Sequence, residues 1–189
     1  MFYNCYNLKS IGTLSNWNTS NVTNLSSMFY NCYSLTTIPS ITSWDLKKVT
    51  NTSSMFWYCF SLKEVLLPNL NMPLNTNMSS MFNYCYNLKT VNLSGWTLTA
   101  MTGTATAPGP FFGNCWNLTN ILGITIPPLA TSLGNCRSLT HEAVMTVINA
   151  LPQLPSGTKK TLNIVTDNIN RLTADEKAIA TGKGWTLAN

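Results

Sequence analysis

The octet MFYNCYNL at residues 1–8 returns as MFYNCYSL at residues 28–35 with one residue changed. Its cysteine, followed three residues later by leucine, recurs along the chain at intervals of 27, 27, 26, 30 and 21 residues. Such intervals are typical of solenoids, in which each repeat buries its apolar face against its neighbours. We number the repeats one to six by their cysteines, which are Cys5, Cys32, Cys59, Cys85, Cys115 and Cys136.

The residues around each cysteine predict the path of one repeat. The run Leu8, Ile11 and Leu14, with its later equivalents, fits a short strand better than a long amphipathic helix. Serine pairs before each following Met-Phe predict the N-cap of a short α or 3₁₀ turn. We therefore predict an α/β solenoid of leucine-rich-repeat type, a right-handed coil with a parallel sheet on one side and these short turns on the other.

The last fifty residues depart from the repeat and predict an α/β cap. The segment 139–155 carries apolar residues on helical spacing, and residues 161–165 predict a strand. Thr173 and Glu176 match a capping box before a second helix, and residues 185–187 predict a final strand. Such a cap would cover the last edge of a parallel sheet. The predicted domains are a solenoid over residues 1–139, made of five repeats and a degenerate sixth, and a cap over residues 140–189.

The six cysteines are spaced one to a repeat, and this spacing argues against a disulfide framework and against a metal site. The chain has no C-x-x-C pair and a single histidine, His141, so no cofactor or metal is expected. Repeats about 4.8 Å apart would align the cysteines in a column, pointing the same way and not facing each other as a disulfide requires. We predict a structural ladder of buried, reduced thiols in which cysteine acts as a small apolar residue.

The composition of the chain argues against three classes of function: nucleic-acid binding, membrane insertion and catalysis. Charged residues make up 9% of the chain, and the net charge of +5 is scattered, without the basic-aromatic module of a nucleic-acid binder. A run of 18 apolar residues is absent, so no membrane insertion is expected. The acids lie in different repeats or at helix ends, and His141 reads as a surface residue. We therefore expect a protein that is not an enzyme.

Aromatic residues flank the cysteines and form the candidate binding surface. In a regular stack they would align in columns, where tyrosine and tryptophan give large contact area at low entropic cost. The alternative is that the rings only stack on one another to cover the edges of the repeats. Lys9, Lys63 and Lys89 form a sparse basic stripe that could attract an acidic partner. The candidate residues are Tyr3, Tyr6, Tyr30, Tyr33, Trp57, Tyr58, Phe60, Tyr84, Tyr86 and Trp116.

The stretch WNTSNVTNLSSMFYNCYSL at residues 17–35 resembles the repeats of BspA-like leucine-rich-repeat surface proteins, in which Trp, Thr-Ser, Val, Met-Phe and Cys occur in the same register. The resemblance covers residues 1–139 and weakens at Pro73 and at an insertion at 104–110. The last residues, from Leu172, are similar to tails that follow such repeats in bacterial surface proteins and in phage tail or fibre proteins.

This resemblance implies a non-catalytic adhesion module at the cell surface or outside the cell, which binds a protein or glycan on a host or neighbouring cell. The alternative is a component of a virion, in a phage tail fibre or in host recognition. Because Met1 is already a motif position, we expect the chain to be the C-terminal piece of a longer protein with further repeats before it. Otherwise a partner would cover the first repeat.

Overall fold

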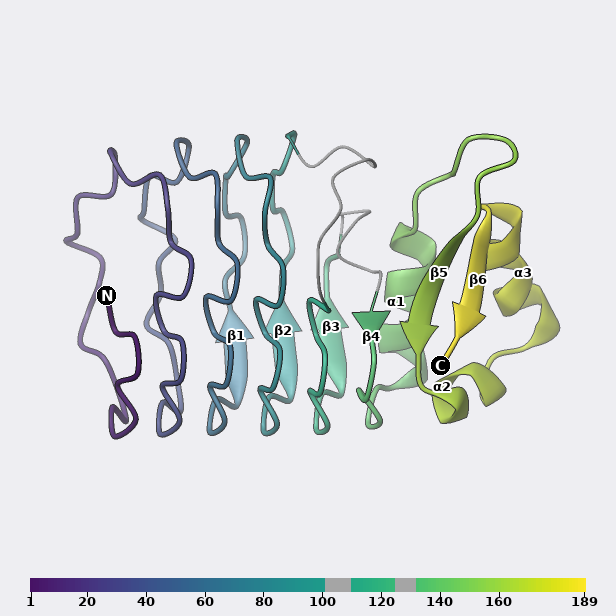
Figure 1. Cartoon of the computed structure of the whole chain (residues 1–189), viewed down its shortest axis with the longest axis horizontal. Coiled ribbons are helices and arrows are strands. Elements are labelled where there is room, and N and C mark those ends of the chain that lie inside the picture. Colours follow the sequence, from purple (N-terminus) through teal and green to yellow (C-terminus); the bar gives the residue numbers. More distant parts are fainter. Residues whose placement is uncertain (101–109, 125–131) are drawn as a thin grey trace.

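The computed structural model describes residues 1–100, 110–124 and 132–189, so the insertion predicted at 104–110 lies outside the described residues except for Pro110. In this part of the chain the fold is mixed α/β, with two small parallel sheets of three strands and three short helices. Figure 1 shows the repeats side by side along the longest axis, with the helices gathered at the C-terminal end. The elements are β1 (Glu64–Leu66), β2 (Thr90–Asn92), β3 (Asn120–Leu122), β4 (Ser132–Leu133), α1 (His141–Ala150), β5 (Lys160–Ile164), α2 (Thr166–Asn170), α3 (Ala174–Gly182) and β6 (Trp185–Ala188).

The first sheet joins the third, fourth and fifth repeats through strands of three residues. β1 pairs with β2, and β2 with β3, all in parallel. The register places Val65 opposite Val91, and Val91 opposite Ile121. These three residues are buried, and the strand residues on either side of each are more exposed. The alternation of side chains along a strand therefore turns one apolar row toward the core.

The strands predicted in the first two repeats do not form: residues 1–63, all of which the structure describes, contain no strand. Pro39, seven residues after Cys32, occupies the position that Leu66 holds in β1. Proline has no N–H to donate to a ladder and is found mainly at sheet edges, so it disfavours a strand through the second repeat. The first two repeats are linked by backbone hydrogen bonds such as that from the N–H of Thr36 to the carbonyl of Lys9 (3.2 Å), and by an isolated bridge between Asn24 and Asn51.

The serine pairs do not begin helices, so the prediction of short α or 3₁₀ turns is wrong. Ser27 has a φ of 55°, the left-handed value found at the third residue of a type II turn. The side chain of Asn24, not a serine, accepts a hydrogen bond from the N–H of Ser26 (2.8 Å). The N–H of Asn31, which would donate to the carbonyl of Ser27 in an α-helix, donates to the carbonyl of Trp57 in the next repeat (2.9 Å).

A column of phenylalanines runs through the core of the repeats. Phe29, Phe56 and Phe82 are fully buried and stack with ring centroids 5.3 and 5.4 Å apart and ring planes within 6°. Burial of each such side chain stabilises the fold by about 1.5–3 kcal/mol. The leucines that follow the cysteines of the second to fifth repeats are also fully buried: Leu35, Leu62, Leu88 and Leu118.

The C-terminal segment follows its local signals. Thr140 caps α1 by accepting a hydrogen bond from the N–H of Ala143 (3.1 Å). The predicted capping box is confirmed, because Thr173 and Glu176 accept hydrogen bonds from each other's N–H groups (3.2 and 2.8 Å). The predicted strands correspond to β5 and β6, which form a parallel sheet with β4. The structure adds α2 and β4 to the predicted elements.

Candidate binding surface

The ten candidate residues lie in three columns that run along the stack. Between Phe and Cys the chain makes a tight turn in each of the first four repeats, for instance with the N–H of Cys59 donating to the carbonyl of Phe56 (3.1 Å). The pre-cysteine column, two residues before the cysteine, contains Tyr3, Tyr30, Trp57, Asn83, Gly113 and Gly134. The middle column contains Asn4, Asn31, Tyr58, Tyr84, Asn114 and Asn135. The post-cysteine column contains Tyr6, Tyr33, Phe60, Tyr86, Trp116 and Arg137. All seven tyrosines of the chain lie in these columns.

Rings of the pre-cysteine column cover each other. Tyr3 stacks on Tyr30 with centroids 4.8 Å apart, and Tyr30 on Trp57 at 4.4 Å, with interplanar angles of 10° and 15°. Burial and the neighbouring tyrosines raise the pKa of Tyr30 above its ordinary value. Both ring faces of Tyr30 are therefore covered, and stacking accounts for this residue. Tyr3, at the end of the column, keeps 55% of its surface exposed.

The post-cysteine column presents its rings to solvent. Its packing is looser: Phe60 meets Tyr86 at 62° and Tyr86 meets Trp116 at 65°, so that ring edges contact ring faces. Tyr33, Phe60 and Trp116 keep 41%, 46% and 50% of their surface exposed although they contact aromatic neighbours. This column is the apolar strip that a partner can reach.

The middle column has a left-handed backbone in every repeat. Its residues have φ values between 56° and 65°, the third position of the turn, where asparagine is tolerated better than bulky residues. Asparagine side chains join neighbouring repeats here: Asn31 Nδ2 donates to Asn4 Oδ1 (3.0 Å), and Asn135 Nδ2 to Asn114 Oδ1 (2.8 Å). The preference of asparagine for this conformation is a sequence signal that predicts the turn, and our sequence analysis missed it.

Tyr58 and Tyr84 interrupt this asparagine ladder. Their φ values are 56° and 62°, and their rings lie parallel, with centroids 4.4 Å apart and an interplanar angle of 1°. Trp57 packs its ring against Tyr58 edge to face at 4.3 Å. Asn31 Oδ1 is buried and has no hydrogen-bond partner among the described residues. An asparagine at position 58 would donate to it, as Asn31 Nδ2 donates to Asn4 Oδ1. The two tyrosines thus replace the residue that this backbone favours.

The cysteines do more than fill space. All six are free thiols, and those of the second to sixth repeats are fully buried. Each of these five donates a hydrogen bond from Sγ to the carbonyl of the phenylalanine in the preceding repeat, at 2.8–3.1 Å. Burial raises the pKa of Cys32 to about 11 and raises the pKa values of Cys59, Cys85 and Cys115. That the thiols are reduced in solution stays a prediction.

The single histidine lies in the C-terminal segment, away from the columns. His141 is exposed at the start of α1, and its Nε2 lies 3.0 Å from Glu176 Oε1 on α3. The hydrogen bond from the N–H of Thr173 lowers the pKa of Glu176, and the hydrogen bond with the side chain of His141 lowers it further. In the described ranges, no group of three or more His, Cys, Asp or Glu side chains could hold a metal ion.

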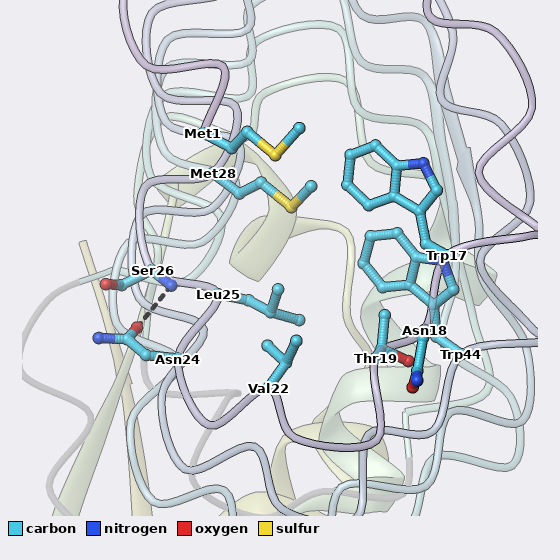
Figure 2. Close-up of a pocket in the computed structure, with 10 residues that line it drawn as sticks. All are labelled: Met1, Trp17, Asn18, Thr19, Val22, Asn24, Leu25, Ser26, Met28 and Trp44. Atoms are coloured by element: carbon cyan, nitrogen blue, oxygen red, sulfur yellow. Dashed lines mark hydrogen bonds between the residues drawn. The ribbon is translucent and has the colours of Figure 1, made fainter.

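A pocket of about 280 Å³ opens into the first repeat. Figure 2 shows Met1 and Met28 on one side of it, facing Trp17 and Trp44, with Leu25 and Val22 below Met28. The residues that line it include no ionisable side chain. The pocket lies inside the first two repeats, and the side chains that line it include no acid, base or metal ligand of the usual kinds.

No helix within the part of the chain that the structure describes is both long enough and apolar enough to span a membrane.

Comparison with known proteins corrects the family resemblance. A search of curated proteins found no match, and a search of solved structures found none. A family model does match residues 1–96, half of the chain, and its description is "Mycoplasma protein of unknown function, DUF285". The resemblance to BspA-like proteins is therefore wrong. It rested on Met-Phe and Cys positions such as Phe56 and Cys59, and these are buried packing positions that any stack of this geometry would need. The chain belongs to the DUF285 family.

Proposed function

We propose that residues 1–139 form a solenoid of leucine-rich-repeat type, which residues 140–189 cap, and that the module is non-catalytic and binds a partner through its aromatic surface. Backbone hydrogen bonds between neighbouring repeats support the solenoid: Phe29 N–H donates to the Met55 carbonyl, and Phe56 N–H to the Met81 carbonyl, both at 2.9 Å. Five repeats thereby hold the exposed post-cysteine column in one line.

The observation that carries the binding proposal is Tyr58. A bulky residue in the left-handed region costs about 1–2 kcal/mol, and a buried unpaired acceptor such as Asn31 Oδ1 costs about 1–3 kcal/mol. Tyr58 contacts four rings, those of Tyr33, Trp57, Tyr84 and Tyr86, and each aromatic pair returns about 0.5–1.5 kcal/mol. Asparagine, which fills this position in four of the six repeats, carries neither cost, so the backbone does not explain this tyrosine. A partner that packs on it does.

The proposed partner is a protein or glycan on a host or neighbouring cell. Rigid aromatic side chains that are already packed, as Trp57, Tyr58 and Tyr84 are, lose little entropy on binding. The two settings predicted from the sequence, a cell surface and a virion, both require this surface to face outward. Immunogold labelling of cells and of released particles separates the two settings.

The test restores the asparagine that four other repeats carry. Tyr58→Asn, alone and with Tyr84→Asn, is compared with the wild-type chain on arrays of immobilised glycoproteins and glycans, and each variant is unfolded in urea. We expect binding to weaken by at least about tenfold, as loss of central aromatic contacts does. We expect Tyr58→Asn to change the free energy of unfolding by less than about 2 kcal/mol, since the donor that Asn31 Oδ1 regains offsets the lost ring contacts.

The matched control is Leu74→Asn, which removes an exposed apolar side chain (52%) from the same region of the stack outside the columns. Its binding should equal that of the wild-type chain. If Tyr58→Asn lowers stability and leaves binding unchanged, the tyrosines serve packing alone and the proposal is wrong. A wild-type chain that binds nothing on either array also contradicts it.

A further inference from the structure

Two lysines of neighbouring repeats lie directly beside each other. The N–H of Lys89 donates to the carbonyl of Lys63 (2.8 Å), so the two residues hold the same position in the third and fourth repeats. Both side chains are exposed, and the structure gives neither ammonium group an acidic partner among the residues it describes. Lys9 holds the same position in the first repeat. Thr36 stands between Lys9 and Lys63, and Thr119 follows Lys89, so the positive charge of this lysine row is concentrated at Lys63 and Lys89.

This arrangement opposes stability. Like charges in adjacent positions of neighbouring strands repel each other, and Glu64 is the one acid in the sequence next to any of these lysines. The wider charge distribution has the same bias: residues 1–139 hold six basic and two acidic residues, whereas residues 140–189 hold five basic and four acidic ones. The excess positive charge therefore belongs to the repeats.

The lysine row runs parallel to the exposed aromatic column. Lys63 follows Phe60 by three residues, and Lys89 follows Tyr86 by three. Three residues span at most about 11 Å even when fully extended, so one bound segment can contact both rows. Apolar rings beside uncompensated ammonium groups suit a ligand that carries apolar and anionic groups together.

The ring geometry favours a polypeptide over a polysaccharide. Sugar rings bind aromatic side chains through open ring faces, but Tyr58 and Tyr84 cover each other's inner faces and Tyr30 lies between Tyr3 and Trp57. The post-cysteine column offers edges and partial faces at mixed angles, which suit side chains of varied shape.

We propose that an acidic polypeptide segment binds along this line, with carboxylates on Lys63 and Lys89 and apolar side chains on Phe60 and Tyr86. The proposal rests on the proposed function and adds the chemical class of the partner. Steering by charge would speed the encounter and make affinity depend on salt.

The experiment uses a labelled random copolymer of glutamate and tyrosine as the probe and the full chain as the receptor. We expect Lys63→Gln with Lys89→Gln to weaken binding about tenfold, as the loss of two partly screened ion pairs does. The matched control is Lys47→Gln with Lys48→Gln, which removes the same charge from exposed lysines outside the row and should change affinity less than about twofold. Wild-type affinity should fall as salt rises from about 0.01 to about 1 M, over which the screening length shrinks from about 30 to about 3 Å.

Four outcomes overturn this inference. Equal losses in the two lysine pairs would mean that only net charge attracts the probe. Tighter binding to hyaluronan than to the copolymer would make the partner an anionic polysaccharide. Failure of the wild-type chain to bind the copolymer also rejects an acidic polypeptide. If Tyr58→Asn weakens binding on the arrays while the Lys63 and Lys89 variant does not weaken copolymer binding, the proposed function stands and this inference falls.

Discussion

The repeats and the C-terminal segment satisfy their backbone hydrogen-bonding groups in different ways. In the repeats, the N–H of Ser27 donates to Ser53 of the next repeat, and strands reach three residues. In the C-terminal segment, α1 and α3 satisfy their backbone groups within ten and nine residues and carry side-chain caps. The repeats therefore depend on neighbours distant in sequence, whereas the helices depend on signals within one or two turns.

The largest expected effect tests the dependence of the repeats on the buried phenylalanine column. Phe56→Ala should lower the free energy of unfolding by about 3–5 kcal/mol, because Phe56 is fully buried and stacks on Phe29 and Phe82. Phe60→Ala, four residues later and 46% exposed, is the control and should cost less than about 1 kcal/mol. Urea unfolding measures both, and equal losses would mean that the column does not hold the repeats together.

An intermediate effect concerns the buried thiols of the repeats. A thiol ionises with a pKa of about 8.5 in an unfolded chain, and burial raises the pKa of Cys85 in the fold. The stabilising contribution is complete below the unfolded pKa and falls as pH rises above it, because the unfolded chain loses the proton first. The loss is about 1.4 kcal/mol per pH unit for each such thiol.

Cys85→Ser removes one of these ionisations and keeps a donor for the Phe56 carbonyl. Plotted from about pH 7 to about pH 10, its free energy of unfolding should therefore fall less steeply than that of the wild-type chain. The control is Cys5→Ser, at the one cysteine that is not buried. If Cys85→Ser and Cys5→Ser flatten the slope equally, burial is not the cause.

The smallest effect tests the local signals of the C-terminal segment. Thr173→Ala removes one half of the capping box of α3 and should lower the free energy of unfolding by about 1 kcal/mol. Thr186→Ala, at an exposed position of β6, is the control and should stay within about 0.5 kcal/mol of the wild-type chain. A loss from Thr173→Ala as large as that from Phe56→Ala would remove the contrast between the two regions.

The sequence by itself determined the features that depend on spacing and on nearby residues. The interval between cysteines predicted the columns, and Thr173 and Glu176 predicted where α3 begins. Helix caps act over three residues, so the sequence contains all the information they need. The strands β5 and β6 were predicted for the same reason, since a short apolar run marks each of them.

Only the tertiary structure decided the features that depend on contacts between repeats. It left residues 1–63 without a strand, although their apolar runs are spaced like those that contain β1 to β3. It also turned the thiol of Cys59 toward the Phe29 carbonyl and, among the residues it describes, left Asn31 Oδ1 without a donor beneath Tyr58. Each of these contacts joins residues 27 to 30 positions apart in the sequence. Their geometry is fixed by the register of one repeat on the next, which no stretch of the chain encodes alone.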